Sequence, residues 1–402
     1  MLKGKTIILG VTGGIAVYKA ADLVSKLKKQ NANVEVIMTD AAMEFVNQLT
    51  FQTMSNNPVH TSMFNKIDKF DVEHISLAKK ADMILVAPAT ANTIGKVANG
   101  FADNLLTTVI MASHAKIVFA PAMNTEMYNN PIHQENMSKL KKLGYEFIQP
   151  GVGLLACGDY GAGKMAEPAD IVEYVIESFV EKDLAGKKVV ITAGPTVELI
   201  DPVRYITNHS SGKMGYLLAN EARTRGADVV LISGPTALEP PKGVEVVRVN
   251  TTNDMFDAVG KYFDKCDVLI KSAAPADYRP ENTSPIKIKK KDGQKDELNI
   301  NFVRNPDIAY YYGNKKDKQI IIGFAAETDN LVEYAKNKLK KKKFDFIVAN
   351  DITKEGAGFK ADTNIVTIID NNESVESYPI MTKKDLAKII LDKANNIIKN
   401  KS

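Results

Sequence analysis

One arrangement of residues occurs twice in this chain and limits its fold more than any other feature. Residues 5–39 pass from a short apolar segment through a glycine turn and a helical pattern to a second apolar segment, and residues 186–234 repeat that order. Each such unit forms part of a parallel sheet covered by helices. Because the pattern starts twice, we predict an α/β protein of two doubly wound, Rossmann-like domains that meet near residues 180–187.

The composition of the whole chain narrows the class of protein. A net charge of +4 in 402 residues gives no argument for a nucleic-acid partner. The sequence opens directly into a predicted strand without a cleavable leader, and no apolar run approaches the roughly 18 residues of a membrane span. With only two cysteines, a disulfide framework is excluded. These features predict a globular, cytoplasmic protein with no membrane partner.

Cys157 stands in an unusual setting for a structural thiol. It lies in the glycine-rich segment LLACGDYGAGK, whereas the other cysteine, Cys266, lies in an apolar pattern. Structural cysteines usually occupy apolar strands or helices. The thiol of Cys157 is therefore either reactive or an accident of composition, and its spacing alone leaves both interpretations open.

Polar and glycine residues follow the predicted strands of the first half. A turn with Gly13 and Gly14 suits a phosphate, although glycine turns before helices are common. Residues 90–93 could present N–H groups and hydroxyls to a phosphate or ring, or could simply cap a helix. His74 at a predicted helix start and Asn124 after a strand are equally ambiguous. Ligands in open α/β sheets bind at the carboxyl ends of strands, so we expect these residues to share one edge.

These segments resemble the homo-oligomeric flavin-containing cysteine decarboxylases, the family of phosphopantothenoylcysteine decarboxylase. A Pro-x-Met-Asn-x-x-Met motif at Pro121 and a Gly-x-Gly-x-Leu-Ala-Cys-Gly loop at Gly151 carry the resemblance. It implies that Asn124 holds the substrate carboxylate, that His74 acts as base or positioner, and that Cys157 on a mobile glycine flap delivers a proton. The residues that it implies for FMN are Gly13, Gly14, Ile15, Thr39, Thr90, Ala91, Asn92 and Thr93.

The chemistry of the implied substrate agrees with a flavin. Its cysteine nitrogen is already acylated, so pyridoxal phosphate cannot form an imine with it. A flavin can take a hydride from the thiol-bearing carbon, and the resulting thioaldehyde accepts the electrons left by carbon dioxide. Return of the hydride then needs a proton donor, which is the role that the resemblance gives to the flap thiol.

Two polar segments stand out in the second half. Residues 204–215, RYITNHSSGKMG, place glycines where a strand passes into a helix, which suits either a phosphate or an ordinary long turn. The lysines of residues 287–291 surround Ile288, a pattern that predicts a half-buried hairpin strand beside the strand end at Asp277. Lysine runs are usually solvated faces, and the lack of interleaved aromatic residues argues against a nucleic-acid site.

This half resembles the phosphopantothenate–cysteine ligases, in the bacterial form fused behind the decarboxylase. The matches include AGPTVELIDPVRYITNHSSGKMG, the Ala-Ala-x-Ala-Asp element, NPDI, GFAAET and ANDI. The resemblance implies activation of a carboxylate by CTP with Mg²⁺ or Mn²⁺, followed by attack of the amine of cysteine on the acyl-cytidylate. Lys287 would stabilise the activation step, and Asn208 would act in conversion of the acyl-cytidylate. The residues implied for CTP are Ala273, Asp277, Lys287, Pro306, Asp307, Ile308, Ala309, Phe324, Lys338 and Lys342.

The combined prediction is a bifunctional enzyme of coenzyme A biosynthesis. Residues 1–182 would form an FMN-dependent decarboxylase domain and residues 183–402 a CTP-dependent ligase domain. The implied partners are 4'-phosphopantothenate, cysteine, CTP and further copies of the chain, as trimeric decarboxylase and dimeric ligase domains.

Two alternatives share parts of this pattern. A flavin-binding regulator without catalysis would need none of His74, Asn124 and Cys157, so their joint presence argues against it. A flavin prenyltransferase-like domain fused to a dinucleotide-binding domain would lack the cysteine flap and leave the lysine-rich segment unexplained.

Overall fold

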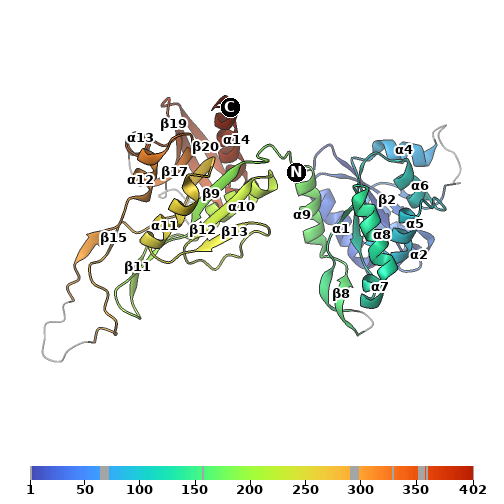
Figure 1. Cartoon of the computed structure of the whole chain (residues 1–402). Helices are drawn as coiled ribbons and strands as arrows, with labels where there is room; N and C mark the ends of the chain where they lie inside the picture. Colours follow the sequence, from blue (N-terminus) through green and yellow to red (C-terminus); the bar gives the residue numbers. More distant parts are fainter. Residues whose placement is uncertain are drawn as a thin grey trace. The chain divides into compact units, whose positions relative to one another are not determined.

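The computed structural model divides into two compact units, Met1–Val180 and Glu181–Ser402 (Figure 1). It describes residues 2–63, 72–155, 158–289, 298–327, 330–351, 358 and 361–401. Each unit contains its own largely parallel sheet with helices on both faces, which confirms the predicted fold class. Among the helices described, none is both long and apolar enough to cross a membrane.

The sheet of the first unit is wholly parallel, with the strand order β3-β2-β1-β4-β5-β6. The strands are β1 (Thr6–Val11), β2 (Asn33–Met38), β3 (Val59–His60), β4 (Met83–Ala89), β5 (Lys116–Pro121) and β6 (Glu146–Phe147). The order runs outward in both directions from β1 and β4. A crevice forms at such a switch point, beyond the carboxyl ends of the two strands.

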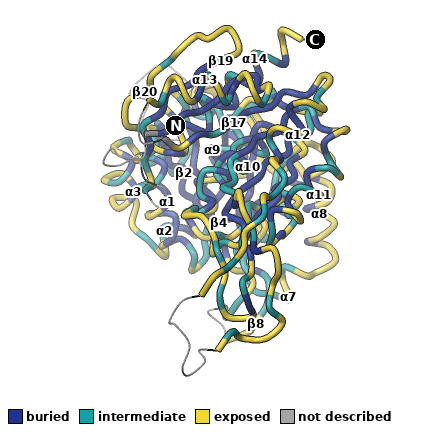
Figure 2. Tube along the Cα trace, turned by 90° about the vertical axis from the view of Figure 1, so that its left-hand side faces the viewer, coloured by how far each residue is buried: buried dark blue, intermediate teal, exposed yellow. Residues whose placement is uncertain are grey.

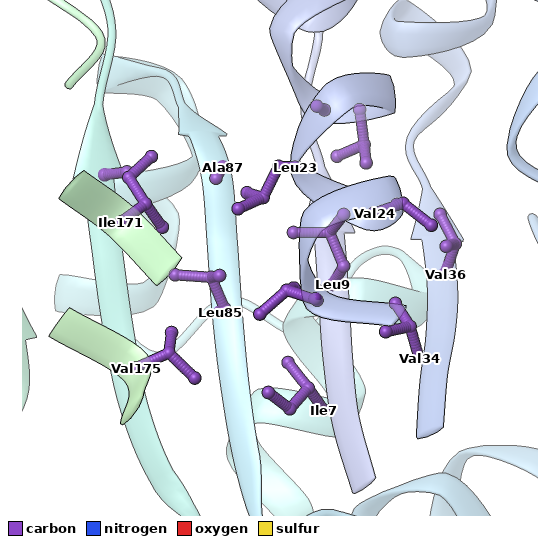
Figure 3. Packing of buried hydrophobic residues seen from close by; sticks show 14 of the residues in the cluster. Ile7, Leu9, Leu23, Val24, Val34, Val36, Leu85, Ala87, Ile171 and Val175 are labelled. Carbon is purple, nitrogen blue, oxygen red and sulfur yellow. The ribbon is translucent and has the colours of Figure 1, made fainter. Parts of the chain in front are cut away.

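Helices cover both faces of this sheet. Ile7 and Leu9 of β1 point to the face covered by α1 and α9 and share one core with Leu23 and Ile171 (Figure 3). Ile8 belongs to the core on the opposite face. This alternation along the strand buries both faces. The helices are α1 (Val17–Lys29), α2 (Asp40–Met43), α3 (Gln48–Ser55), α4 (Glu73–Lys80), α5 (Ala91–Ala98), α6 (Leu105–Ala112), α7 (Thr125–Asn129), α8 (Pro131–Lys142) and α9 (Pro168–Ser178).

A short antiparallel hairpin follows the sheet of the first unit. It consists of β7 (Gly151–Leu154) and β8 (Tyr160–Lys164), and most of its residues are exposed or half-buried (Figure 2). The two strands of the hairpin lie on either side of Cys157 in the sequence, so they flank the predicted cysteine flap.

The sheet of the second unit has the order β13-β12-β9-β14-β17-β18-β19-β20. Its parallel strands are β9 (Lys188–Ala193), β12 (Asp228–Ser233), β13 (Glu245–Arg248), β14 (Val268–Lys271), β17 (Ile320–Glu327) and β18 (Phe346–Asp351). Two antiparallel strands, β19 (Thr363–Asp370) and β20 (Val375–Thr382), extend one edge. The sequence pattern predicted the parallel part and not this antiparallel pair.

Helices again lie on both faces of this sheet. One face packs against α10 (Lys213–Thr224) and α14 (Lys383–Lys401). The other packs against α11 (Thr252–Phe263), α12 (Ile308–Lys315) and α13 (Leu331–Lys341). The face that each residue of β14 presents therefore decides which helices it meets.

Two small hairpins project from the second unit, and we call them together the arm (Figure 1). The arm comprises β10 (Val197–Leu199) with β11 (Tyr205–Thr207) and β15 (Tyr278–Pro280) with β16 (Phe302–Arg304). The predicted lysine-bearing strand is wrong in its described part, because residues 287–289 belong to no strand. Instead, the backbone N–H of Ile288 donates to Asp201 Oδ2 at 3.1 Å, which fastens this segment to the β10–β11 turn.

Candidate active sites

The crevice of the first unit is formed by the turns after β1 and β4. The hydroxyl of Thr12 donates to the carbonyl of Pro88 at 2.7 Å, and the N–H of Thr90 donates to that hydroxyl at 3.1 Å. Thr90 also caps α5 by accepting from the N–H of Thr93. The capping interpretation is therefore correct for this residue, and the cap fixes the same turn at the crevice.

The turn after β1 requires glycine at Gly13. A Cβ there would lie 2.4 Å from the Cβ of Ala41, too close for any other residue. Helix α1 then begins at Val17 with no capping side chain among the described residues. Two of its first N–H groups bond within the turn, that of Val17 to the carbonyl of Gly14 and that of Lys19 to the carbonyl of Ala16, both at 3.0 Å. What favours an anion here is the positive end of the helix dipole beside the glycine turn.

A cavity of about 350 Å³ lies beside this edge, after β2 and β3. Of the predicted FMN residues, Thr39 lines it, and the Thr39 hydroxyl is buried without a hydrogen-bond partner in the described structure. A buried polar atom without a partner is costly, so the hydroxyl has capacity for a ligand. Ile15, at the start of α1, is instead exposed.

Asn124 follows β5 and meets the β7–β8 hairpin. Its Oδ1 caps α7 by accepting from the N–H of Glu126 at 2.8 Å, and its Nδ2 donates to Asp159 Oδ2 at 2.8 Å. Asp159 lies two positions beyond Cys157, which is outside the described residues. The structure thus brings the segment after the predicted acid to the residue predicted to hold the carboxylate.

Glycines allow this hairpin to approach the backbone after β5. Gly163 has φ +137°, and a Cβ on it would lie 2.3 Å from the carbonyl oxygen of Met123. A Cβ on Gly161 would lie 2.6 Å from the hydroxyl of Thr125. At these two positions glycine is needed for packing, a role that the interpretation as a mobile flap did not include.

His74 lies half-buried in the first turn of α4, beside a cluster of charges that the sequence analysis missed. His60 Nδ1 is 2.5 Å from Glu73 Oε1, and His60 Nε2 is 3.4 Å from Glu35 Oε2. Lys80 also pairs with Glu35. The cluster joins the first turn of α4 to strands β2 and β3. Its only signal in the sequence is a glutamate within the apolar strand NVEVIM.

The cluster shifts the pKa values of its members in opposite directions. The hydrogen bond with His60 outweighs burial and, with Lys80, lowers the pKa of Glu35 to about 2. Burial alone would lower the pKa of His60, but its hydrogen bonds with Glu35 and Glu73 raise it above the ordinary value. The carboxylate and the imidazolium therefore stabilise each other.

The second unit contains a cleft of about 790 Å³ beyond the carboxyl ends of its central strands. Asn208 lines it, and so do nine of the residues predicted for CTP. These are Ala273, Asp277, Pro306, Asp307, Ile308, Ala309, Phe324, Lys338 and Lys342. Lys287 does not line the cleft and is exposed on the segment that accompanies the arm.

The turn before α10 forms one wall of this cleft. Asn208 Nδ2 donates to the carbonyls of Pro275 at 3.0 Å and Ala274 at 3.4 Å, which joins the turn to the Ala-Ala-x-Ala-Asp element. Gly212, with φ +76°, precedes α10, and no capping side chain is found for it within the described ranges. The N–H of Lys213, the first of α10, donates a long bond of 3.5 Å to the Ser211 hydroxyl, and the positive end of the helix dipole lies at the cleft, where it favours an anion.

A buried polar network fixes the opposite wall, and sequence reasoning missed it. Asn305 Nδ2 donates to the carbonyl of Ala276 at 2.8 Å and to Glu198 Oε1 at 3.2 Å. Glu198 also accepts from the N–H of Thr252 at 2.9 Å, and the N–H of Ala276 donates to the Thr196 hydroxyl at 2.9 Å. These residues are far apart in the sequence, so no local sequence pattern predicts their contacts.

Charged groups meet where β14, α12 and α13 face the cleft. Asp307 caps α12 through the N–H of Tyr310, and Lys342 Nζ lies 3.0 Å from Asp307 Oδ2. Burial acts to raise the pKa of Asp307, but that N–H and the Lys342 ammonium outweigh it and lower the pKa. Lys271, which the sequence analysis did not select, also lines the cleft.

Comparison with known proteins decides the family. The first unit matches the family model "Flavoprotein" over residues 1–180, and the second matches "DNA/pantothenate metabolism flavoprotein C-terminal domain" over residues 184–398. The coenzyme A biosynthesis bifunctional protein CoaBC of Bacillus subtilis (strain 168) is 49% identical over 395 residues, 97% of each chain. The chain belongs to this bifunctional family of coenzyme A biosynthesis.

Two further comparisons involve the same family. The coenzyme A biosynthesis bifunctional protein of Vibrio vulnificus (strain CMCP6) is 44% identical over 398 residues, 99% of each chain. A crystal structure of the C-terminal domain of a CoaBC protein is 44% identical and covers 55% of this chain and all of that one, with a TM-score of 0.47.

Membership of the bifunctional family confirms the predicted class of function. The protein is an enzyme of coenzyme A biosynthesis with decarboxylase and ligase activities on small molecules, and its first unit is a flavoprotein domain. A regulator without catalysis and a prenyltransferase fusion are therefore set aside.

Proposed function

We propose that the second unit joins 4'-phosphopantothenate to cysteine with CTP, and that the first unit then decarboxylates 4'-phosphopantothenoylcysteine to 4'-phosphopantetheine with FMN. One observation supports the assignment of the ligase reaction to the second unit. Except for Lys287, the residues predicted for CTP come from separate segments of the chain and line a single cleft with Asn208. The proposed decarboxylase and ligase domains are residues 1–182 and 183–402.

The cleft is suited to the charge that the ligase reaction gathers. Lys338 and Lys342 line it, and so does the start of α10, where the helix dipole is positive. A carboxylate attacking a triphosphate and a departing pyrophosphate both concentrate negative charge, which fixed N–H groups and ammonium ions stabilise.

A divalent cation, Mg²⁺ or Mn²⁺, completes the proposed ligase reaction. Mg²⁺ usually binds nucleotide phosphates together with one or two carboxylates, so we propose that it enters with CTP. In the described part of the chain no group of three or more His, Cys, Asp and Glu side chains could hold a metal ion. We therefore assign no metal ligands.

Lys287 and Asn208 are proposed to serve different steps of the ligase reaction. Lys287 would stabilise activation of the carboxylate, whereas Asn208, fixed at the turn before α10, would bind the acyl-phosphate region of the intermediate. In the full-length protein, Lys287→Gln should suppress pyrophosphate release. Asn208→Ala should still release pyrophosphate but fail to transfer the acyl group to cysteine. Equal loss of both steps in both variants would contradict this division.

The crevice of the first unit fits FMN. The glycine turn at Gly13 and Gly14 and the positive end of the α1 dipole favour the phosphate, and the unpartnered hydroxyl of Thr39 lines the adjoining cavity. When bound, FMN would supply the acceptor for a hydride from the thiol-bearing carbon of the substrate. The remaining residues proposed to contact it are Ile15, Thr90, Ala91, Asn92 and Thr93.

Three side chains are proposed to handle the substrate of the decarboxylase. Asn124 would donate from Nδ2 to the carboxylate, in place of its present bond to Asp159 Oδ2. His74 would act as base or positioner from the first turn of α4. Cys157 would return a proton to carbon after carbon dioxide has left. The bond between Asn124 and Asp159 supports this arrangement because Asp159 is close in sequence to Cys157.

Further copies of the chain are the proposed macromolecular partners, as dimers of the ligase domain and trimers of the decarboxylase domain. Large apolar side chains exposed on the arm and its neighbouring segments support the dimer, because monomers rarely expose such patches. These side chains are Leu199, Val203, Tyr205, Tyr278, Ile286, Leu298 and Phe302. The native mass of the full-length protein tests the assembly, and a monomer would contradict it. A cytoplasmic location stays a prediction.

A further inference from the structure

Lys271 is the last residue of β14, and its side chain lines the cleft of the second unit. It lies on the same face of the strand as Leu269, which packs among α11, α12 and α13. The residue is only 7% exposed. Its ammonium nitrogen is buried and has no hydrogen-bond partner among the described residues. A buried amine without a partner needs a reason, because an apolar side chain would fill the same space at lower cost.

The charged neighbours of Lys271 do not supply that partner. Asp307 attracts it, but the Asp307 carboxylate already accepts from Lys342 and from the N–H of Tyr310. Lys342 repels it. The strands on either side offer no charge, since Lys271 is paired with Thr192 of β9 and Gly323 of β17. The other charged or titratable side chains that line the cleft are His209, Lys213, Asp277, Tyr278, Arg304, Lys338 and Lys383.

These surroundings favour the neutral amine. Burial, with a smaller contribution from repulsion by Lys342, lowers the pKa of Lys271 to about 7, although Asp307 acts to raise it. An anion that entered the cleft would reverse the balance, because a nearby negative charge favours the ammonium form. The geometry and the charges thus describe a site that an anion would stabilise.

We propose that Lys271 binds the nucleotide: its Nζ, buried in the cleft without a hydrogen-bond partner among the described residues, donates as an ammonium to a phosphoryl oxygen of CTP. The assignment rests on the proposed role of this cleft in binding CTP. The nucleotide is favoured over the acyl substrate because Lys271 adjoins Asp307 and Lys342, both predicted for CTP. No covalent bond changes, and one proton passes from solvent to Lys271 Nζ.

The proposal makes binding of CTP dependent on pH in a defined direction. Below the pKa of Lys271 in the unliganded protein, the amine is already protonated and binding takes up no proton. Above that pKa, binding of each nucleotide must be accompanied by uptake of one proton from solvent. The affinity for CTP should therefore fall by up to about tenfold per pH unit above pH 7, until the pKa of the complex is reached. The phosphates of CTP and their binding of the metal ion also depend on pH. The decisive quantity is therefore the difference in the pH dependence of CTP affinity between the native protein and a variant that lacks the amine.

Calorimetric titration of the full-length protein with CTP and Mg²⁺ tests the proposal. At pH 8, in two buffers of different ionisation enthalpy, the native protein should take up about one proton per nucleotide more than Lys271→Met does. Lys271→Met should bind CTP about tenfold more weakly at pH 7. The control is Lys261→Met, which removes an exposed lysine of α11 and should behave as the native protein does. Thermal unfolding verifies that each variant is folded.

The outcomes of these titrations distinguish the role of Lys271 from the proposed role of the cleft as the CTP site. Equal proton uptake and equal affinity in the native protein and Lys271→Met would overturn the role of Lys271 while leaving the cleft as the CTP site. The same titration with 4'-phosphopantothenate distinguishes the source of the phosphate. Proton uptake with that ligand and none with CTP would overturn the nucleotide assignment. If CTP failed to bind the native protein at all, the proposed function of the cleft itself would be overturned.

Discussion

His60 lies between two carboxylates, Glu35 and Glu73, next to the predicted catalytic His74. Its pKa in the folded protein is raised, so its contribution to stability is complete below the unfolded value of about 6.5 and is lost as pH rises through the folded value. Glu35 stays ionised across this range, since its pKa is lowered to about 2.

The His60→Gln substitution should therefore destabilise the first unit more at pH 6 than at pH 9. We expect a loss of about 1–3 kcal/mol at pH 6, because a neutral amide cannot pair with both carboxylates. Scanning calorimetry of the full-length protein at the two pH values measures it. His114→Gln, at an exposed site of the same unit, is the matched control. A loss that is equal at both pH values would show that the imidazolium does not stabilise the cluster.

Cys157→Ser separates a proton donor from a packed thiol, because the two side chains are nearly isosteric. Serine has a much higher pKa, and a positioned general acid usually contributes about 10²–10⁴-fold. Loss of carbon dioxide precedes the proton transfer, so the variant should release carbon dioxide for about one turnover and accumulate the enethiol. Product mass and released carbon dioxide measure both. Normal multiple turnover would remove the thiol from the mechanism.

Nine of the ten residues predicted for CTP line the cleft, and the predictions failed for a clear reason where they failed. Asp307 and Lys342 fall within recognisable motifs. Lys271 ends an apolar strand, where lysine usually reaches solvent, so its burial depends on α12 and α13 folding over it. Glu35 of the first unit is likewise a charged residue in an apolar strand, and it is buried in the folded protein. Burial of a charge is a property of the tertiary structure.

At the scale of elements, the proposed decarboxylase site depends on how the β7–β8 hairpin meets the segment after β5. The N–H of Met123 donates to the carbonyl of Gly163 at 3.0 Å, and Asn124 contacts Asp159 across the same junction. Gly163 permits this approach because it has no Cβ.

The Gly163→Ala substitution should displace the hairpin, since its Cβ would lie 2.3 Å from the Met123 carbonyl oxygen at a φ that alanine rarely adopts. We expect decarboxylase activity to fall at least about tenfold while ligase activity is unchanged. Separate assays of the two half-reactions measure this. Gly153→Ala is the control on the same hairpin, because its Cβ would meet no described atom within 4 Å. Equal activities for the two variants would mean that the junction does not position the site.

Elements were predicted well where local pattern governs them. Buried parallel strands are recognisable in a sequence as short apolar runs, and the parallel strands of both sheets form at such runs. The strand expected around Ile288 does not form in its described part. That segment is instead held at Ile288, whose N–H donates to the buried carboxylate of Asp201 and whose carbonyl accepts from the Arg204 guanidinium at 2.9 Å. The alternation of lysine with isoleucine carries no information about these bonds.

At the scale of the whole molecule, the division into Met1–Val180 and Glu181–Ser402 makes each unit a candidate for independent folding. Each has its own sheet, its own cores and its own candidate site. The repeated start of the α/β pattern predicted two domains, whereas the arm and the antiparallel β19–β20 pair lie outside that pattern.

Residues 1–182 expressed alone should form a yellow oligomer that decarboxylates 4'-phosphopantothenoylcysteine. The reason is that the crevice proposed for FMN and the β7–β8 hairpin lie entirely within this unit. Visible absorbance, native mass and release of carbon dioxide measure the outcome. A colourless aggregate would count against both the boundary and the proposed flavin site.

A mass balance on the full-length protein tests the central claim, that one chain performs the CTP-dependent ligation and then the decarboxylation. The protein is supplied with 4'-phosphopantothenate, cysteine, CTP, Mg²⁺ and FMN, and the products are counted. We predict equal amounts of pyrophosphate, CMP, carbon dioxide and 4'-phosphopantetheine, no product without CTP, and full decarboxylation of supplied 4'-phosphopantothenoylcysteine without CTP. Formation of 4'-phosphopantetheine from 4'-phosphopantothenate without CTP, or no carbon dioxide from 4'-phosphopantothenoylcysteine, would contradict the account.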